Sequence, residues 1–186
     1  MELEQEAQHD EDLRSILSSG RTLLDHLRHN YEQLSSDLIE EAYGWLGQWE
    51  EQLRHIDWNT SQTPSDVDRK VLLFRRARPL LELRRYDELI TVCKELDSLA
   101  DESEKPVVAG VFGQALYEKG EFEEVLDVLR SATLDSAARV WLYRCLAQAR
   151  LELQDEAIES YAEYDRLVGN DIIAAKMLRE AMPEGD

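Results

Sequence analysis

Two stretches, Leu83-Arg-Arg-Tyr86-Asp-Glu-Leu89 and Lys119-Gly-Glu-Phe122-Glu-Glu-Val125, decide the fold of this chain. They superpose residue by residue at a separation of 36, and Leu153-Gln-Asp-Glu-Ala157-Ile158 matches them with a shortened turn. Each stretch has an acidic pair followed by an apolar residue, and the first two also carry an aromatic side chain before the acids. Because acidic side chains complement the positive N-terminal end of a helix dipole, each stretch predicts a turn followed by the start of a helix.

Helix-forming residues dominate the chain around these stretches. Of its 186 residues, 43% are hydrophobic, and only 8 are glycine and 4 proline. Long runs are rich in Leu, Glu, Ala and Arg, which lose little side-chain freedom in a helix. No stretch alternates between apolar and polar residues for long enough to indicate a strand. The composition therefore predicts an all-α protein.

The hairpins that these turns would close resemble tetratricopeptide repeats over about residues 67–169. A period near 34 residues made of two helices is typical of that family. A small side chain marks the middle of each expected first helix, at Ala77, Gly113 and Ala147. The resemblance implies about three antiparallel helix pairs whose first helices line an inner groove. The sequence departs from the family where the second helix begins, because the characteristic alanine is kept only at Ala157 and the closing proline is absent.

The remaining chain divides into shorter segments. Apolar rows at helical spacing run from Leu13 to Leu34 and from Leu38 to Ile56, which predicts two helices paired as an antiparallel hairpin. A polar stretch around Pro64 ends this pattern. The predicted organisation is a disordered acidic tail (1–10), an N-terminal helical hairpin (11–58), a linker (59–66), TPR-like helix pairs (67–169), and a capping helix with a tail (170–186).

No motif predicts an enzyme or a cofactor. The sequence has no glycine-rich phosphate loop, no nucleophile elbow and no Cys/His pair at catalytic spacing. Cys93 and Cys145 sit in apolar helical patterns and are expected to be buried thiols. His26 and His29 have a spacing that zinc sites can use, but they lie outside the apolar rows and are expected to be exposed. We find no signal peptide and no apolar run of about 20 residues, so we expect a cytoplasmic protein that does not enter a membrane.

Charge narrows the choice of partner. The formal net charge is −19, which disfavours nucleic-acid binding because that requires Lys and Arg to neutralise phosphates. The acidity can reflect a basic partner, solubility, or a salty cytoplasm. Against this background, basic residues gather at Arg69, Lys70, Arg75, Arg76, Arg78, Arg84 and Arg85. This cluster can face the protein's own acidic surface, bind an acidic segment of a partner, or form a nucleic-acid patch.

The sequence therefore predicts a protein-interaction module that binds a segment of another protein. The side chains expected on the inner face are Phe74, Arg78, Leu81, Gln114, Tyr117, Trp141, Arg144 and Gln148. They combine aromatic anchors, arginine and amides, which suits an extended ligand. For Phe74, Leu81 and Trp141, the alternative is packing within the hairpins. The Lys/Asn/Arg clamp that some members use for a partner's terminal carboxylate is not carried over, because the matching positions, among them Phe74, Val111 and Cys145, are largely apolar.

Two other functions remain open. Gly20-Arg-Thr-Leu-Leu24 and Ser35-Ser-Asp-Leu-Ile-Glu-Glu-Ala-Tyr43 loosely resemble the N-terminal region of type III secretion translocator chaperones, which are small, acidic and cytoplasmic. That resemblance implies a secretion chaperone. A structural subunit of a larger assembly is the third possibility, with the N-terminal hairpin as its docking face or as the interface of a homodimer.

Overall fold

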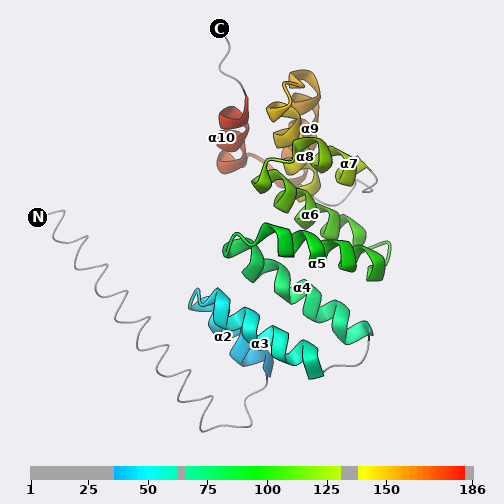
Figure 1. Cartoon of the computed structure of the whole chain (residues 1–186). Helices are drawn as coiled ribbons and strands as arrows, with labels where there is room; N and C mark the ends of the chain where they lie inside the picture. The colour runs from blue at the N-terminus through cyan, green and yellow to red at the C-terminus, as the bar shows by residue number, and fades with distance from the viewer. Residues whose placement is uncertain (1–35, 63–65, 131–137, 183–186) are drawn as a thin grey trace, which may run out of the picture. The chain divides into compact units, whose positions relative to one another are not determined.

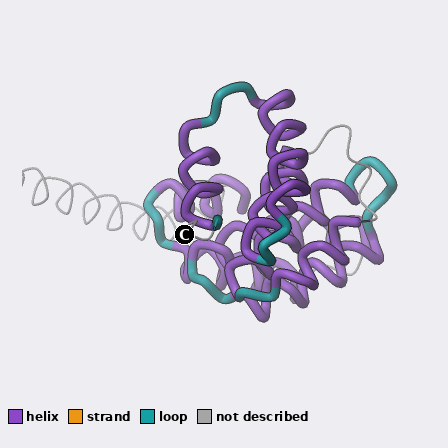
Figure 2. Tube along the Cα trace, turned by 90° about the horizontal axis from the view of Figure 1, so that it is seen from above, coloured by secondary structure: helices purple, strands orange, loops and turns teal. Residues whose placement is uncertain are grey.

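The computed structural model of the chain describes residues 36–62, 66–130 and 138–182, and every regular element among them is an α-helix (Figures 1 and 2). The prediction of an all-α protein is therefore confirmed. The predicted acidic tail, the helix from Leu13 to Leu34, and His26 and His29 lie outside the described residues.

The described helices divide into two compact units, with the division between Gln62 and Asp66. The first unit contains a hairpin of α2 (Ser36–Trp45) and α3 (Trp49–Gln62). The prediction of one helix from Leu38 to Ile56 is wrong, because the chain turns at Gly47, whose φ is +65°. Glycine adopts this left-handed backbone without the steric cost that a side chain adds. The predicted linker 59–66 is also too long, since α3 continues to Gln62.

The second unit contains three further hairpins and a final helix. Its elements are α4 (Asp66–Glu82), α5 (Tyr86–Leu99), α6 (Lys105–Lys119), α7 (Phe122–Arg130), α8 (Ala138–Arg150), α9 (Gln154–Val168) and α10 (Ile172–Ala181). The hairpins α4–α5, α6–α7 and α8–α9 follow one another along the unit (Figure 1). Between hairpins, α5 packs on α6, α7 packs on α8, and α6 packs directly on α8. The final helix α10 also packs on α8.

The same turn closes all three hairpins of the second unit. Its middle residue has a positive φ, +56° at Arg84, +84° at Gly120 and +62° at Glu152. The next residue donates its N–H to a carbonyl five residues back. These bonds run from Arg85 to Leu80 at 2.9 Å, from Glu121 to Leu116 at 3.0 Å, and from Leu153 to Gln148 at 2.9 Å. The hairpin of the first unit has the equivalent bond from Gln48 to Tyr43, at 2.9 Å.

These turns define which residues correspond between hairpins. Leu80, Leu116 and Gln148 are equivalent, so the offsets are 36 and then 32 residues. The residue of α8 that matches Ala77 and Gly113 is therefore Cys145, and not Ala147 as the sequence suggested. A shift of two residues is about 200° around a helix, so it moves a side chain to the opposite face.

Close packing inside each hairpin explains why a small residue is required in the first helix. A Cβ on Gly113 of α6 would lie 3.0 Å from Cδ2 of Leu129 in α7. Leu129 is completely buried, as are Leu80, Leu89, Val125, Leu146 and Ala157 of the same core. Together with Leu116 of α6, which is 1% exposed, these side chains come from both helices of each hairpin, so the core runs along the seam between paired helices.

Candidate functional site

A groove of about 360 Å³ is formed on the second unit by side chains of three first helices, α4, α6 and α8. Its lining residues are Phe74, Ala77, Arg78, Leu81, Glu82, Val111 and Arg139. Five of them come from α4 at a spacing of three or four residues, which places them on one helical face. The groove is thus an apolar floor with two arginines and one glutamate at its edges.

Arg139 reaches the groove because α6 has a glycine where α8 approaches it. A Cβ on Gly110 would lie 3.3 Å from both Cβ and Cγ of Arg139. The aliphatic part of Arg139 therefore lies directly against the backbone of α6. Gly110 is buried, whereas Arg139 is exposed, so the side chain leaves the packed helix interface and ends at the surface.

The charge of Arg139 is not neutralised by the described part of the chain. No carboxylate among the described residues forms an ion pair with it. This contrasts with Lys119, whose Nζ lies 2.8 Å from Asp87 and 2.7 Å from Glu121. In a chain with 40 acidic and 21 basic side chains, intramolecular partners are abundant. Arg139 thus presents a cation at the groove of a chain whose formal net charge is −19.

The structure brings together three of the predicted binding residues. Phe74, Arg78 and Leu81 all line the groove from α4. Phe74 and Leu81 are half-buried and Arg78 is exposed. Each of them is thus accessible from the groove.

Gln114 and Tyr117 of α6 belong instead to a polar and aromatic cluster between helices. The ring of Tyr117 lies 5.4 Å from Phe122 and 5.7 Å from Tyr143, measured between centroids. The Nε–H of Arg150 donates to the Tyr117 hydroxyl at 3.4 Å. The pKa of Tyr143 is raised, first by burial and then by the nearby Glu118. These residues contribute to packing, and they do not line the groove.

Trp141, Arg144 and Gln148 do not line the groove either. The Arg144 guanidinium lies 5.4 Å from the centre of the Trp141 ring, which is a cation–π contact. Gln148 is 6% exposed, and its amide is hydrogen-bonded to the Ser160 hydroxyl of α9 at 2.6 Å. The two-residue difference in register explains the error, because it turns these positions away from the face that carries Arg139.

The sequence did not predict four of the groove residues as binding residues: Ala77, Glu82, Val111 and Arg139. Aligning α8 by its turn at Leu151-Glu-Leu153, and not by its alanine, gives the correct register. The alignment then pairs Arg139 with Val71 and Val107, two apolar side chains that are both exposed. Arg139 is exposed at the same position of its hairpin.

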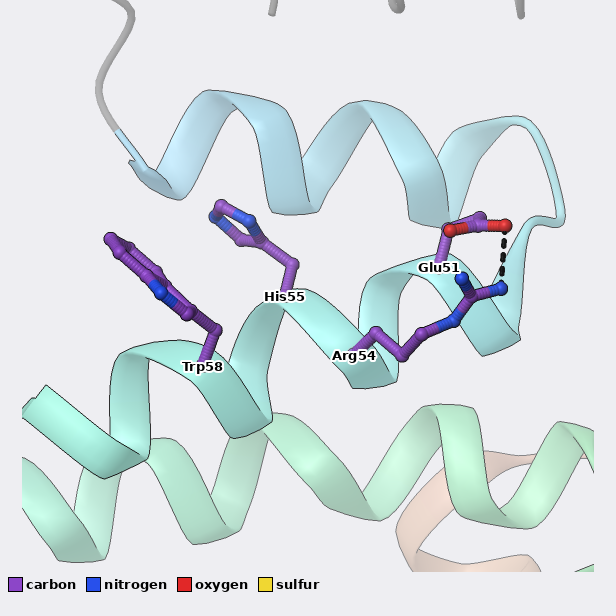
Figure 3. Close-up of a pocket in the computed structure, with 4 residues that line it drawn as sticks. All are labelled: Glu51, Arg54, His55 and Trp58. Carbon is purple, nitrogen blue, oxygen red and sulfur yellow. Dashed lines mark hydrogen bonds and ion pairs between the residues drawn. The ribbon is translucent and has the colours of Figure 1, made fainter.

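A second hollow, of about 370 Å³, lies on α3 in the first unit (Figure 3). Glu51, Arg54, His55 and Trp58 line it, and all four side chains come from this one helix. Arg54 donates to Glu51 at 2.7 Å, and the rings of His55 and Trp58 are stacked at 6.3 Å between centroids. Trp58 is 61% exposed. Among the described residues, the groups that line this hollow therefore come from one helix face, which carries two aromatic rings.

Most members of the predicted basic cluster that can be assigned have partners within the second unit. Arg69 pairs with Glu95, Lys70 with Glu104 at 2.8 Å, and Arg85 with Glu88 at 2.6 Å. The hydrogen bond from Lys70 is the main reason that the pKa of Glu104 lies below its usual value. These contacts agree with the intramolecular interpretation of the cluster. Arg78, a further member, also lines the groove.

The two cysteines are not placed for nucleophilic chemistry. Both are buried, and burial raises the pKa of each thiol to about 12. At neutral pH the thiolate, which is the reactive form, is therefore scarce. Among the described residues, no group of three or more His, Cys, Asp or Glu side chains is arranged to hold a metal ion.

Comparison with known proteins adds no family to these observations. No family model matches the chain, and no curated protein matches it in sequence. Within the described residues, no helix combines the length and the apolar character that crossing a membrane requires.

Proposed function

We propose that this chain is a non-catalytic protein-interaction module that holds a segment of another protein in the groove of α4, α6 and α8. The observation that carries the proposal is the lining of this groove, where Phe74, Leu81 and Val111 provide apolar area beside Arg78 and Arg139. Aromatic and arginine side chains dominate the energetics of protein interfaces. The groove is lined by three alternate helices, whereas the described lining of the hollow on α3 comes from one helix.

The repeated hairpin turns support an array of the tetratricopeptide kind as the scaffold. The three turns have the same hydrogen bonds, which supports treating α4, α6 and α8 as corresponding first helices. In solenoids built this way, small rotations between units create an extended surface for binding. The inner-face location of the groove follows from the same assignment.

Selection of peptides from a random library displayed on phage tests the proposal without a known partner. The full chain serves as bait, and the selected peptides are synthesised and titrated against three proteins: the wild type, Val111→Glu and Ile158→Glu. Val111 is a half-buried groove residue, whereas Ile158 is 57% exposed on α9 and outside the groove. Both variants add one carboxylate to an apolar surface position.

We expect Val111→Glu to weaken binding at least tenfold, which is the loss of about 1.4 kcal/mol or more typical of a hot spot. The new carboxylate would occupy apolar space and pair with the groove arginines. Ile158→Glu should bind as the wild type does. Equal affinity of all three proteins, or a selection that yields no binding peptide, would contradict the proposed site.

A further inference from the structure

Given the proposed function, the side chains that line the groove also indicate which protein segments it binds. Its floor is apolar, so an occupant must supply at least one large apolar side chain to bury against Phe74 and Leu81. Its rim has more basic than acidic side chains, because α4 and α8 each contribute an arginine beside the single glutamate, Glu82. The side chains beside the apolar anchor therefore decide the selectivity.

Arg139 is the rim residue that the fold holds in place most firmly. Its stem packs so closely against Gly110 that a Cβ added there would lie 3.3 Å from Cβ and Cγ of Arg139. Such contact restricts the rotamers of a long side chain and reduces the entropy that it loses on binding. No described carboxylate occupies its guanidinium, so binding a partner's acid there would not first require breaking an internal ion pair.

A guanidinium offers paired N–H donors that match the two oxygens of a carboxylate. A lysine or arginine of the ligand would be repelled by Arg139. The described lining of the groove contains one carboxylate, Glu82, against two guanidinium groups. Basic segments are attracted to the acidic molecule as a whole, with its net charge of −19, but that attraction is long-ranged and weakens with salt. At contact distance inside the groove, the local charges oppose the overall field.

We propose that the groove selects a segment in which an aspartate or glutamate side chain lies next to a large apolar side chain. Arg139 binds the carboxylate, and Phe74 and Leu81 hold the apolar group. Gly110 is a positioning residue, because its lack of a side chain sets where Arg139 lies. The partner is an internal stretch of another protein, recognised by a side-chain carboxylate and not by its C-terminus.

The test uses the peptides selected above, synthesised with amidated C-termini so that their only carboxylates are on side chains. Each is compared with a copy in which Glu is replaced by Gln, or Asp by Asn. Both peptides are titrated against the wild type, Arg139→Gln and Lys94→Gln. Lys94 is the matched control, since it is exposed on α5, forms no ion pair with a described carboxylate, and lies outside the groove.

We expect selected peptides to carry an acidic residue beside Leu, Phe or Trp. Arg139→Gln should weaken them about three- to tenfold, in the range of charge-assisted contacts, and Lys94→Gln should have little effect. The amide copies should bind wild type about as weakly as the acids bind Arg139→Gln, with no further loss on combining the two changes. Gly110→Ala should reproduce part of the loss, because the added Cβ displaces Arg139.

Two results would overturn this inference while leaving the proposed function intact. One is equal binding of acidic and amide peptides to the wild type, and the other is an equal response to Arg139→Gln and Lys94→Gln. Either result would mean that the groove binds apolar segments without distinguishing acidic from neutral side chains beside them. Failure of the proposed function itself has a different signature, which is the insensitivity of all peptides to Val111→Glu.

Discussion

At the scale of single residues, the contact between Gly113 and Leu129 shows how tightly the second hairpin is packed. Replacing Gly113 with alanine places a methyl group 3.0 Å from a fully buried leucine. We expect Gly113→Ala to lower the free energy of unfolding by about 1–2 kcal/mol, because overpacking outweighs the roughly 1 kcal/mol gained from better helix propensity. Urea denaturation followed by circular dichroism measures the change.

Gly110→Ala is the matched control for this prediction. Its Cβ would lie 3.3 Å from Cβ and Cγ of Arg139, which is less tight than the 3.0 Å approach at Gly113, so the loss of stability should be smaller. If Gly113→Ala proved as stable as Gly110→Ala, the close approach of α6 and α7 would be incorrect.

At the scale of elements, the hairpin turns differ in how well their residues suit a left-handed backbone. Glu152 has a φ of +62°, which is unfavourable for a residue with a side chain, whereas Gly120 occupies the same place at +84°. We expect Glu152→Gly to raise the free energy of unfolding by about 0.5–1 kcal/mol and Gly120→Ala to lower it by about 1 kcal/mol. Thermal melts of both variants should shift in opposite directions, and shifts of the same sign would contradict the shared turn.

The last helix depends on one carboxylate. Asp171 caps α10 by accepting from the N–H groups of Ile173 at 2.9 Å and Ala174 at 3.2 Å, and the Tyr164 hydroxyl of α9 donates to it at 2.6 Å. The Tyr164 hydrogen bond, followed by these backbone bonds, lowers the pKa of Asp171 below its usual value. The ionised form is therefore the one that the folded state stabilises.

This linkage predicts that α10 loosens in acid. The contribution of Asp171 is complete above the ordinary aspartate pKa of about 3.9 and is lost as the pH falls through the lower folded value. The protection factors of the α10 amides against hydrogen exchange in Asp171→Asn at neutral pH should match those of the wild type at low pH. Tyr164→Phe should lower these protection factors less than Asp171→Asn does, because the capping bonds to the backbone remain. Unchanged protection of α10 in Asp171→Asn would contradict this role.

At the scale of the whole molecule, the boundary between the two units should be the first point of cleavage. Since α3 continues to Gln62, its backbone N–H groups there are already bonded, and the accessible stretch is shorter than the predicted 59–66. Limited digestion with a protease of broad specificity should cut first between Gln62 and Asp66. Mass spectrometry of the fragments identifies the site. A first cut at Lys119-Gly120 would contradict the boundary between the two units.

How much the sequence could predict depended on the kind of signal. Tyr86 and Phe122 lie at equivalent positions after equivalent turns, so local pattern was sufficient to predict these hairpins. The apolar rows predicted one continuous helix through Gly47, but the chain turns there, because the spacing of apolar residues does not reveal a single positive φ. Predicting the groove required the correct register of α8. The sequence suggested the wrong register because Ala147, a small residue, matched Ala77 and Gly113 in place of Cys145. Arg139 depended on a contact between helices that no local pattern contains.

The central claim is that the groove of α4, α6 and α8 holds a protein segment, and chemical-shift mapping tests it most directly. A peptide selected on the full chain is titrated into isotope-labelled protein, and its effects are followed at backbone amides and methyl groups. The account predicts that the largest shifts occur at Leu81, Val111 and Arg139, and that Val111→Glu abolishes them. Shifts confined to α2 and α3 around Trp58, with the groove signals unchanged, would contradict it.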